Sequence, residues 1–350
     1  MKLVRLPGAL QIFDGMTNAE AYVEVFHNRL MKPLPDTEKT GEYWGSSSRA
    51  DFYPYLRKTL SELCTKKGEI KILDVGAGSG EMIEHVIKNY PAILTAIEPN
   101  PLMLKSYLKA VHRNNLKLHG TYSGQVQDIY PHNYAQHWFA SLEKQDLVLA
   151  SHMIYGLTSA SSDNEIYPET DLITFLSVLY EKLSDNGTIF LVYAIGENTL
   201  LGEAALNCMK YRDDNYAANV RKIWQARTEL LEKGIAKQQL DLIHPDFECE
   251  FASYITRSNI YGDRIEDIAA YCILGELTEI DNSPFDLKKL IHNFKYVKNH
   301  AGEFQLHQVP SGQREGMYAV STPQVVCTIK KRAKQSSSCM NNYLHTQLKA

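Results

Sequence analysis

The stretch Ile70–Met82 constrains the fold more than any other part of the chain. It opens with the apolar, β-branched run Ile70–Val75, which has the length of a strand and is stopped by glycine. Helical spacing of apolar residues follows over Glu81–Asn89. Between them lie three glycines at every second position: Gly76, Gly78 and Gly80. The stretch therefore predicts a strand, a tight turn whose backbone a flat ligand can approach closely, and a helix N-terminus.

Acidic residues stand on both sides of this turn. Asp74, at the end of the expected strand, would place a fixed carboxylate beneath a ligand on the turn. The next expected strand, Ala92–Ile97, ends in Glu98-Pro99-Asn100. A carboxylate at the tip of the second strand of a βαβ unit is placed to accept both hydroxyls of a ribose. A glycine turn followed by such an acid about 20 residues on is more specific than the turn alone.

The glycine spacing separates two classes of cofactor. A dinucleotide site usually has the pattern G-x-G-x-x-G, which lays a pyrophosphate on the helix N-terminus. Here the pattern is Asp74-x-Gly76-x-Gly78-x-Gly80, with acids at both ends and no basic residue in the turn. That pattern suits a ligand with a positive charge and no phosphate. The alternative is that the protein is another Rossmann-like fold that binds a different nucleotide.

The pattern resembles the first motif of class I S-adenosylmethionine-dependent methyltransferases, whose cofactor carries an amine and a sulfonium. The resemblance implies that S-adenosyl-L-methionine is the cofactor. It also implies that a set of residues around the turn and the second strand binds it, namely Asp74, Gly76, Ala77, Gly78, Gly80, Glu98, Pro99 and Asn100.

The composition is that of an ordinary globular protein. The 350 residues can bury a substantial core, and 44% hydrophobic and 22% charged residues are typical values. The net charge of −4 argues weakly against a nucleic-acid surface, and no apolar run approaches the ~20 residues that span a bilayer. The six cysteines occur singly, so neither zinc nor a disulfide framework is indicated and a cytoplasmic location is the default expectation. No metal is expected, because no carboxylate cluster accompanies His132 and His137.

Strand and helix patterns alternate as far as residue 194, which predicts an α/β fold with helices on both faces of a Rossmann-like class I methyltransferase sheet. The later strands are expected at Leu116–His119, Asp146–Ser151, Thr188–Ala194, Phe247–Ile255 and Val325–Ile329. We divide the chain into N-terminal helices and lid (1–63), cofactor-binding core (64–200), helical substrate-covering insert with the sixth strand (201–320), last core strand (321–332) and disordered tail (333–350). The loop Asp36–Ser48 contains two aromatic residues, Tyr43 and Trp44. They either form part of a lid that closes on a ligand or pack on the core.

Two segments at the carboxyl ends of the expected strands add candidate residues. Gly120–Asp128 is expected to be a polar loop that either is solvated or reaches an adenine edge through Ser123, Gly124, Gln125 and Asp128. His152 follows the fourth strand directly. It could take a proton, orient a substrate, or merely pack against the ribose or adenine.

Several stretches together resemble histamine N-methyltransferase and its relatives. They are residues 21–26, residues 69–73 with the glycine turn and Glu98-Pro99, Ser151–Tyr155, and Glu250–Ile255 followed by Ile265–Leu274. The resemblance spans roughly residues 20 to 330, and only its cofactor motifs are specific. It implies that Tyr122–Gly124 joins the glycines and Glu98 in holding the cofactor.

The residues that bind the substrate amine in that family have poor matches in this sequence. Its N-terminal acid would fall near Asp36 or Glu38, its glutamine after strand four at His152, and its asparagine before the last strand at Ser321. Histamine as the substrate therefore does not follow.

The expected reaction is N-methylation of a small amine by in-line displacement, in which the enzyme aligns a desolvated lone pair about 3 Å from the methyl group. Candidates for handling the proton of the amine are His152, Asp36, Glu38 and Tyr155. The expected partner is a small-molecule methyl acceptor, with no nucleic acid and no membrane, and the oligomeric state stays open. The alternatives are a protein side-chain methyltransferase and a non-catalytic binding protein that keeps the cofactor fold.

Overall fold

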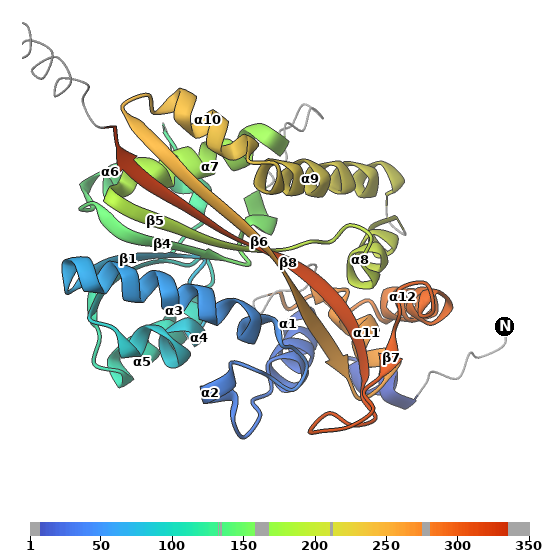
Figure 1. Cartoon of the computed structure of the whole chain (residues 1–350). Coiled ribbons are helices and arrows are strands. Elements are labelled where there is room, and N and C mark those ends of the chain that lie inside the picture. The colour runs from blue at the N-terminus through green and yellow to red at the C-terminus, as the bar shows by residue number, and fades with distance from the viewer. Residues whose placement is uncertain are drawn as a thin grey trace, which may run out of the picture.

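A single mixed sheet organises the computed structural model, which describes residues 8–131, 133, 135–157, 168–210, 213–274 and 281–334. The strand order is β3-β2-β1-β4-β5-β8-β6, with β7 paired to β8 (Figure 1). The strands are β1 Ile70–Val75, β2 Ala92–Ile97, β3 Lys117–Tyr122, β4 Gln145–Ser151, β5 Leu183–Ala194, β6 Phe247–Gly262, β7 His307–Gln308 and β8 Tyr318–Ala333. Neighbours from β3 to β5 pair in parallel, whereas β8 and β6 are antiparallel additions. The predicted fold class, a Rossmann-like methyltransferase sheet, is confirmed.

Helices cover both faces of this sheet, as predicted. The described α-helices are α1 Asn18–Tyr22, α2 Thr37–Thr40, α3 Ser48–Lys67, α4 Glu81–His85, α5 Pro101–Arg113, α6 Gln136–Ser141, α7 Pro168–Lys182, α8 Leu200–Lys210, α9 Asp214–Glu232, α10 Ile235–Ile243, α11 Ile265–Tyr271 and α12 Leu287–His300. One buried cluster joins the strands to α3, α4 and α5, and another joins them to α6, α7 and α10. The sequence analysis did not predict α8 or α10.

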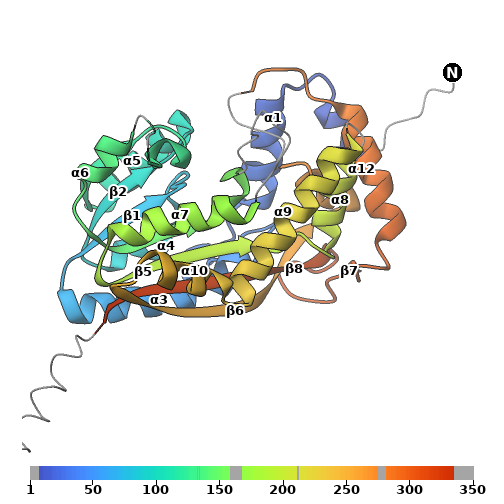
Figure 2. The same cartoon turned by 90° about the horizontal axis from the view of Figure 1, so that it is seen from above.

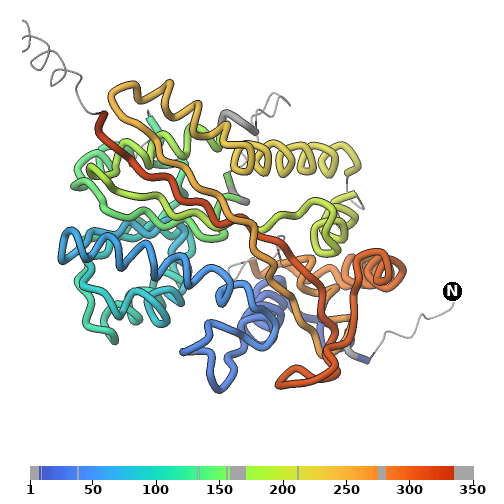
Figure 3. The backbone as a smooth tube through the Cα atoms, viewed as in Figure 1, coloured from blue at the N-terminus to red at the C-terminus, as the bar shows by residue number. Residues whose placement is uncertain are grey.

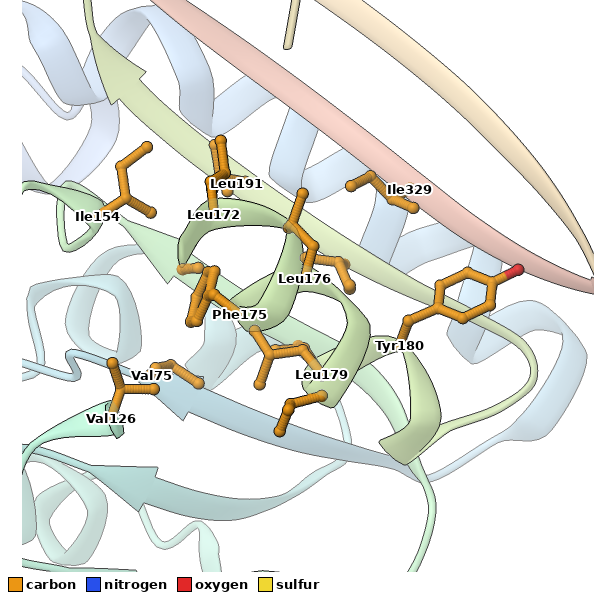
Figure 4. Packing of buried hydrophobic residues seen from close by; sticks show 14 of the residues in the cluster. Val75, Val126, Ile154, Leu172, Phe175, Leu176, Leu179, Tyr180, Leu191 and Ile329 are labelled. Atoms are coloured by element: carbon orange, nitrogen blue, oxygen red, sulfur yellow. The ribbon is translucent and has the colours of Figure 1, made fainter. Parts of the chain in front are cut away.

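The contact of α7 with the sheet shows why these elements form. Its apolar residues recur at helical spacing and are fully buried: Leu172, Phe175, Leu176 and Leu179. They pack on Val75 of β1, Leu191 of β5 and Ile329 of β8 (Figure 4). Each buried side chain of this size contributes about 1.5–3 kcal/mol, which holds the three strands in one layer.

The β6–β8 pair is much longer than the sequence predicted. Its register runs from Phe247↔Ala333 to Gly262↔Tyr318, so the predicted ends at Ile255 and at Val325–Ile329 were wrong. Pro323 explains part of the wrong strand boundary, because proline has no N–H group to donate to a neighbouring strand in the middle of a sheet. Here β5 ends at Ala194, which pairs with Gln324, and the proline therefore lies where β8 loses that neighbour. The pair runs the length of the molecule (Figure 3).

Two further expectations need correction. Residues 120–122 belong to β3 and not to a loop, and the polar loop starts only after Tyr122. Among the expected N-terminal helices, the first, which the apolar spacing predicts over Asn18–Leu30, is α1 followed by a π-helix, η2 Val23–Leu30. The expected disordered tail lies outside the described residues from position 335 onward.

A second group of helices covers one end of the sheet. Residues near the start of the chain share a buried cluster with α8, α11 and α12. In Figure 2, α1, α8 and α12 lie at one end of the molecule, and β2, α5 and α6 lie at the other. The start of the chain and the helices α8, α11 and α12 therefore form one structural unit over the sheet.

The loop Asp36–Ser48 is fixed by packing and hydrogen bonds. Arg314 donates to the carbonyls of Trp44 and Tyr43 at 3.2 and 2.5 Å and to Glu42 at 2.7 Å. Tyr43 is 5% exposed, and its hydroxyl is 2.7 Å from His85 Nε2. Of the two interpretations of its aromatic residues, packing on the core is the one observed. No helix in the described ranges has the length and apolar character needed to cross a membrane.

Candidate functional site

A cavity of about 730 Å³ lies at the carboxyl ends of β1 and β4. The strand order reverses between these two strands, which is where open α/β sheets bind ligands. One part of its wall is formed by the turn at residues 76–79, by Glu98 and by residues 125–127. The wall also includes Phe26, Phe52, Trp224 and Tyr271, which come from the covering helices and α3. The volume falls in the range of roughly 300–1,000 Å³ that is typical of small-molecule sites.

The glycine turn has the conformation that its sequence requires. Gly76, Gly78 and Gly80 have φ values of +67°, +57° and +90°. A Cβ on Gly76 would lie 2.6 Å from Cβ of Met153, in the segment after β4. The two strand ends therefore approach each other too closely for any larger residue, which places the turn and the segment after β4 in one wall.

Gly76→Ala should destabilise the fold by about 2–4 kcal/mol, because it combines left-handed backbone strain with overpacking against Met153. Chemical denaturation measures this loss. Gly120→Ala is the matched control, since a Cβ there meets nothing within 4 Å and the backbone φ is not positive. Equal stability of the two variants would contradict the close approach.

Glu98 joins the second strand to the turn. Its side chain is buried, and its two carboxylate oxygens accept the backbone N–H groups of Gly78 and Asn100, each at 2.8 Å. Both Glu98 and Pro99 lie in the cavity wall. The Asn100 side chain instead caps α5, accepting the N–H of Leu102 at 2.9 Å. The carboxylate of Glu98 is thus held in one orientation at the edge of the turn.

Asp74 lies behind the turn and not in the cavity wall. It shares a strand face with Ile70 and Ile72, which pack against the helices α3, α4 and α5. Neither of its carboxylate oxygens makes a hydrogen bond of normal geometry within the part of the chain that the structure describes. Burial, followed by the carboxylates of Glu98 and Glu81, raises the pKa of Asp74 to about 7, while the Tyr107 hydroxyl is the neighbouring group that favours the ionised form and lowers this pKa.

An ion pair between Arg49 and Glu81 stands in the cavity wall, and sequence reasoning missed it. Arg49 Nη2 lies 3.5 Å from Glu81 Oε2, and Ser79 Oγ donates to the same carboxylate at 2.7 Å. Burial opposes ionisation of Glu81, but Arg49 and Ser79 together hold its pKa below the ordinary value. No local signal marks Arg49, because its partner comes from another helix 32 positions away.

His152 is held in an uncommon backbone conformation, with φ +54°. Its N–H donates to the Val192 carbonyl at 2.9 Å, and its Nε2 lies 3.2 Å from Ser48 Oγ. Burial, and then the charge of Arg49, lowers the pKa of His152 to about 3. The imidazole is therefore neutral at physiological pH, and it lines the cavity as the sequence analysis expected.

Other predicted site residues lie elsewhere. Asp36 is the residue before α2 and is absent from the cavity wall. The side chains of Glu38 and Tyr155 lie outside what the structure describes. Ser123 and Gly124 do not line the cavity, and their place is taken by the next residues, Gln125, Val126 and Gln127.

The segment at 122–128 has a structural explanation of its own. Asp128 accepts the Tyr122 hydroxyl at 3.0 Å and the Gln125 N–H at 2.9 Å, and a Cβ on Gly124 would lie 2.5 Å from the Tyr122 ring. On β8, Thr322 and Gln324 line the cavity and Ser321 does not. Among the described residues, no cluster of three or more His, Cys, Asp or Glu side chains could hold a metal ion.

Comparisons with known proteins give only distant likenesses. No protein-family model matches the chain, and no curated protein sequence matches it. Among solved structures, a putative methyltransferase from Bacillus halodurans is 15% identical with a TM-score of 0.44, covering 78% of this chain and 99% of its own. The plantazolicin methyltransferase BamL, solved with a triazolic desmethylPZN analogue and SAH, is 13% identical with a TM-score of 0.37, covering 90% of this chain and 97% of its own. The [4+2]-cyclase SpnF is 10% identical with a TM-score of 0.44, covering 93% and 98%.

Proposed function

We propose that this protein is an S-adenosylmethionine-dependent methyltransferase that transfers a methyl group to the nitrogen of a small amine. The observation that carries the proposal is the position of Glu98. It ends the second strand, lies in the cavity wall and accepts the Gly78 N–H of the glycine turn at 2.8 Å. A carboxylate in this position recognises the two hydroxyls of a ribose.

The residues around the turn fit this cofactor in shape and charge. Glycines expose the backbone, so a flat nucleoside can lie against it. Glu81 and Glu98 place carboxylates around the turn, which favours a ligand with a positive charge. Arg49 and Glu81 offer opposite charges side by side, as an amino-acid end with one amine and one carboxylate requires. When bound, the cofactor supplies a methyl group that its sulfonium has already activated.

The chain then has two tasks, which are alignment and the exclusion of water. Phe26, Phe52 and Trp224 also line the cavity, and we assign to their rings the part that encloses an organic acceptor. Holding two reactants in line contributes up to roughly 7–11 kcal/mol, more than general-base assistance of about 10²–10⁴-fold. A histidine whose pKa is about 3 is a weak base at neutral pH, so His152 serves as a neutral hydrogen-bonding group.

The size of the cavity favours a small acceptor over a protein side chain. The volume of about 730 Å³ must hold both reactants, and helices of the cover contribute Trp224, Tyr271 and Leu201 to its wall. The test is S-adenosylhomocysteine formation with pooled small amines and, separately, with pooled peptides. We expect product with the amines. Product with peptides only would favour the protein methyltransferase, and no product with either pool would favour a binding protein.

Trp224→Ala should raise the KM for the acceptor by roughly 10- to 100-fold, because it removes a large aromatic contact from the wall. The Kd of the cofactor, measured by calorimetry, should stay the same. Tyr216→Ala on the same helix is the control, since Tyr216 is 54% exposed and lies outside the cavity. An equal loss of cofactor affinity in Trp224→Ala would contradict the division of the cavity into two parts.

A further inference from the structure

One long edge of the sheet is only partly covered. β6 is the last strand in the sheet order, so one side of its backbone pairs with β8 and the other side faces outward. In Figure 2, β6 lies along one border of the molecule. Its middle carries two large hydrophobic side chains that are exposed, Tyr254 at 44% and Ile255 at 59%. An open edge of this kind can pair with a strand of another chain.

Hydrogen bonds near the two ends of β6 show which backbone groups face outward. Near its start, the Cys249 N–H donates to the Asp241 carboxylate at 2.8 Å. Near its end, the Asn259 carbonyl accepts the Ser47 N–H at 3.0 Å. The register with β8 is unbroken between these positions, so the backbone groups alternate strictly between the two sides. The odd-numbered residues of β6 therefore turn their N–H and C=O groups outward.

Four outward-facing residues lie between these two covered positions, namely Phe251, Ser253, Ile255 and Arg257. Within the part of the chain that the structure describes, their outward N–H and C=O groups make no hydrogen bond. The usual protections of an edge strand are also missing here, since residues 251–257 include no proline, no bulge and a single charged side chain. This stretch is therefore a surface that can bind an extended strand, with a defined limit at each end.

We propose that this edge pairs with the same segment of a second copy of the chain, antiparallel and about a two-fold axis at Tyr254. A two-fold axis perpendicular to the sheet reverses the strand direction and keeps each face on its own side. Centred on Tyr254, it sets Ser253 opposite the partner subunit's Ile255, and Phe251 opposite the partner subunit's Arg257. Each such pair exchanges two N–H···O bonds, so all four open residues are satisfied in both copies. The inference does not depend on the proposed methyl transfer.

The segment is self-complementary in length and in charge, which favours a second copy over an unrelated strand. The covered positions, Cys249 and Asn259, lie five residues before and five residues after Tyr254, so the open stretches of two copies coincide. The guanidinium of Arg257 lies opposite the Phe251 ring and not opposite a like charge. At the axis Tyr254 meets its own copy, and aromatic pairs directly opposite each other stabilise a sheet.

Sedimentation velocity of the full chain measures this association. We expect a mass of twice the 39.8 kDa of one chain. Ser253→Pro removes an outward N–H but no bond to β8, and Ile255→Lys adds a charge without changing the backbone, so each should weaken the dimer by roughly 10-fold or more. Leu242→Lys is the matched control on α10, where Leu242 is 74% exposed, and it should stay dimeric. A wild type with the mass of one chain up to about 1 mM, or a dimer that both edge variants keep unweakened, would overturn the inference.

Disulfide trapping tests the position of the axis. In an antiparallel pair of this register, the two Cα atoms of residue 254 lie about 4.5 Å apart, within the range of a disulfide. Tyr254→Cys should therefore form a disulfide-linked dimer under mild oxidation. Ala252→Cys is the control, because its own copy would lie roughly 14 Å away, and the wild type treated in the same way accounts for the native cysteines. A linked Ala252→Cys dimer, or an unlinked Tyr254→Cys dimer, would overturn the proposed pairing.

Discussion

Replacing Glu98 by alanine should weaken the binding of S-adenosylmethionine by roughly 30- to 1,000-fold. The carboxylate is expected to accept two ribose hydroxyls, and hydrogen bonds to a charged acceptor are the stronger class. It also holds the N–H groups of Gly78 and Asn100, so the turn loses its fixed shape in the variant. A net loss of about 2–4 kcal/mol gives the stated range. Calorimetric titration of the cofactor or of S-adenosylhomocysteine measures it.

Two controls make this result specific. Glu84→Ala removes another acid from the neighbouring helix α4, where Glu84 pairs with Arg113 at 3.3 Å outside the cavity wall, and its affinity should be unchanged. Denaturation of Glu98→Ala shows whether it folds at the titration temperature, because Glu98 satisfies two backbone donors. A folded Glu98→Ala variant with unchanged affinity would rule out the ribose role.

Asp74→Asn should change how the stability of the protein depends on pH. The pKa of Asp74 is raised from its ordinary value of 3.8 to about 7, chiefly by burial and then by Glu98 and Glu81. Between these two pH values the folded state keeps its proton while the unfolded state releases it. The free energy of unfolding contributed by this group is therefore complete below about pH 4 and is lost as the pH rises through 7. The variant has no such loss.

The expected size of this effect is up to about 4 kcal/mol, since each pKa unit corresponds to about 1.36 kcal/mol. Urea denaturation of both proteins at pH 4.5, 6 and 8 measures it, and the difference in unfolding free energy should move in favour of Asp74→Asn as the pH rises. Asp128→Asn is the control, since Asp128 already has hydrogen-bond donors in Tyr122 and Gln125. Parallel pH profiles for the wild type and Asp74→Asn would contradict an uncharged Asp74 in the folded protein.

The part of the site that sequence reasoning found is the part that local sequence encodes. The turn after β1 needs glycine because its backbone has positive φ, and Glu98 follows directly from the alternation of strand and helix. The parallel strands β1, β2, β4 and β5 were recognised for the same reason, since their apolar interiors are continuous in sequence.

The rest of the site depends on contacts between distant segments. Arg49, Ser48 and Gln324 look like ordinary polar residues until α3 and β8 come together at the end of β4. The length of β6 and β8 was missed because polar residues and Pro323 interrupt the alternation, and pairing over 16 residues on each strand compensates for it. Asp36 was a candidate from an alignment alone, and it lies directly before α2, outside the cavity wall.

A crystal structure of the protein with S-adenosylhomocysteine bound tests the central claim most directly. The account predicts the nucleoside across the turn at residues 76–80, with both ribose hydroxyls on the Glu98 carboxylate and the sulfur facing the part of the cavity lined by His152. A cavity that stays empty at saturating ligand, or one that instead takes up a nicotinamide or flavin nucleotide, would contradict it.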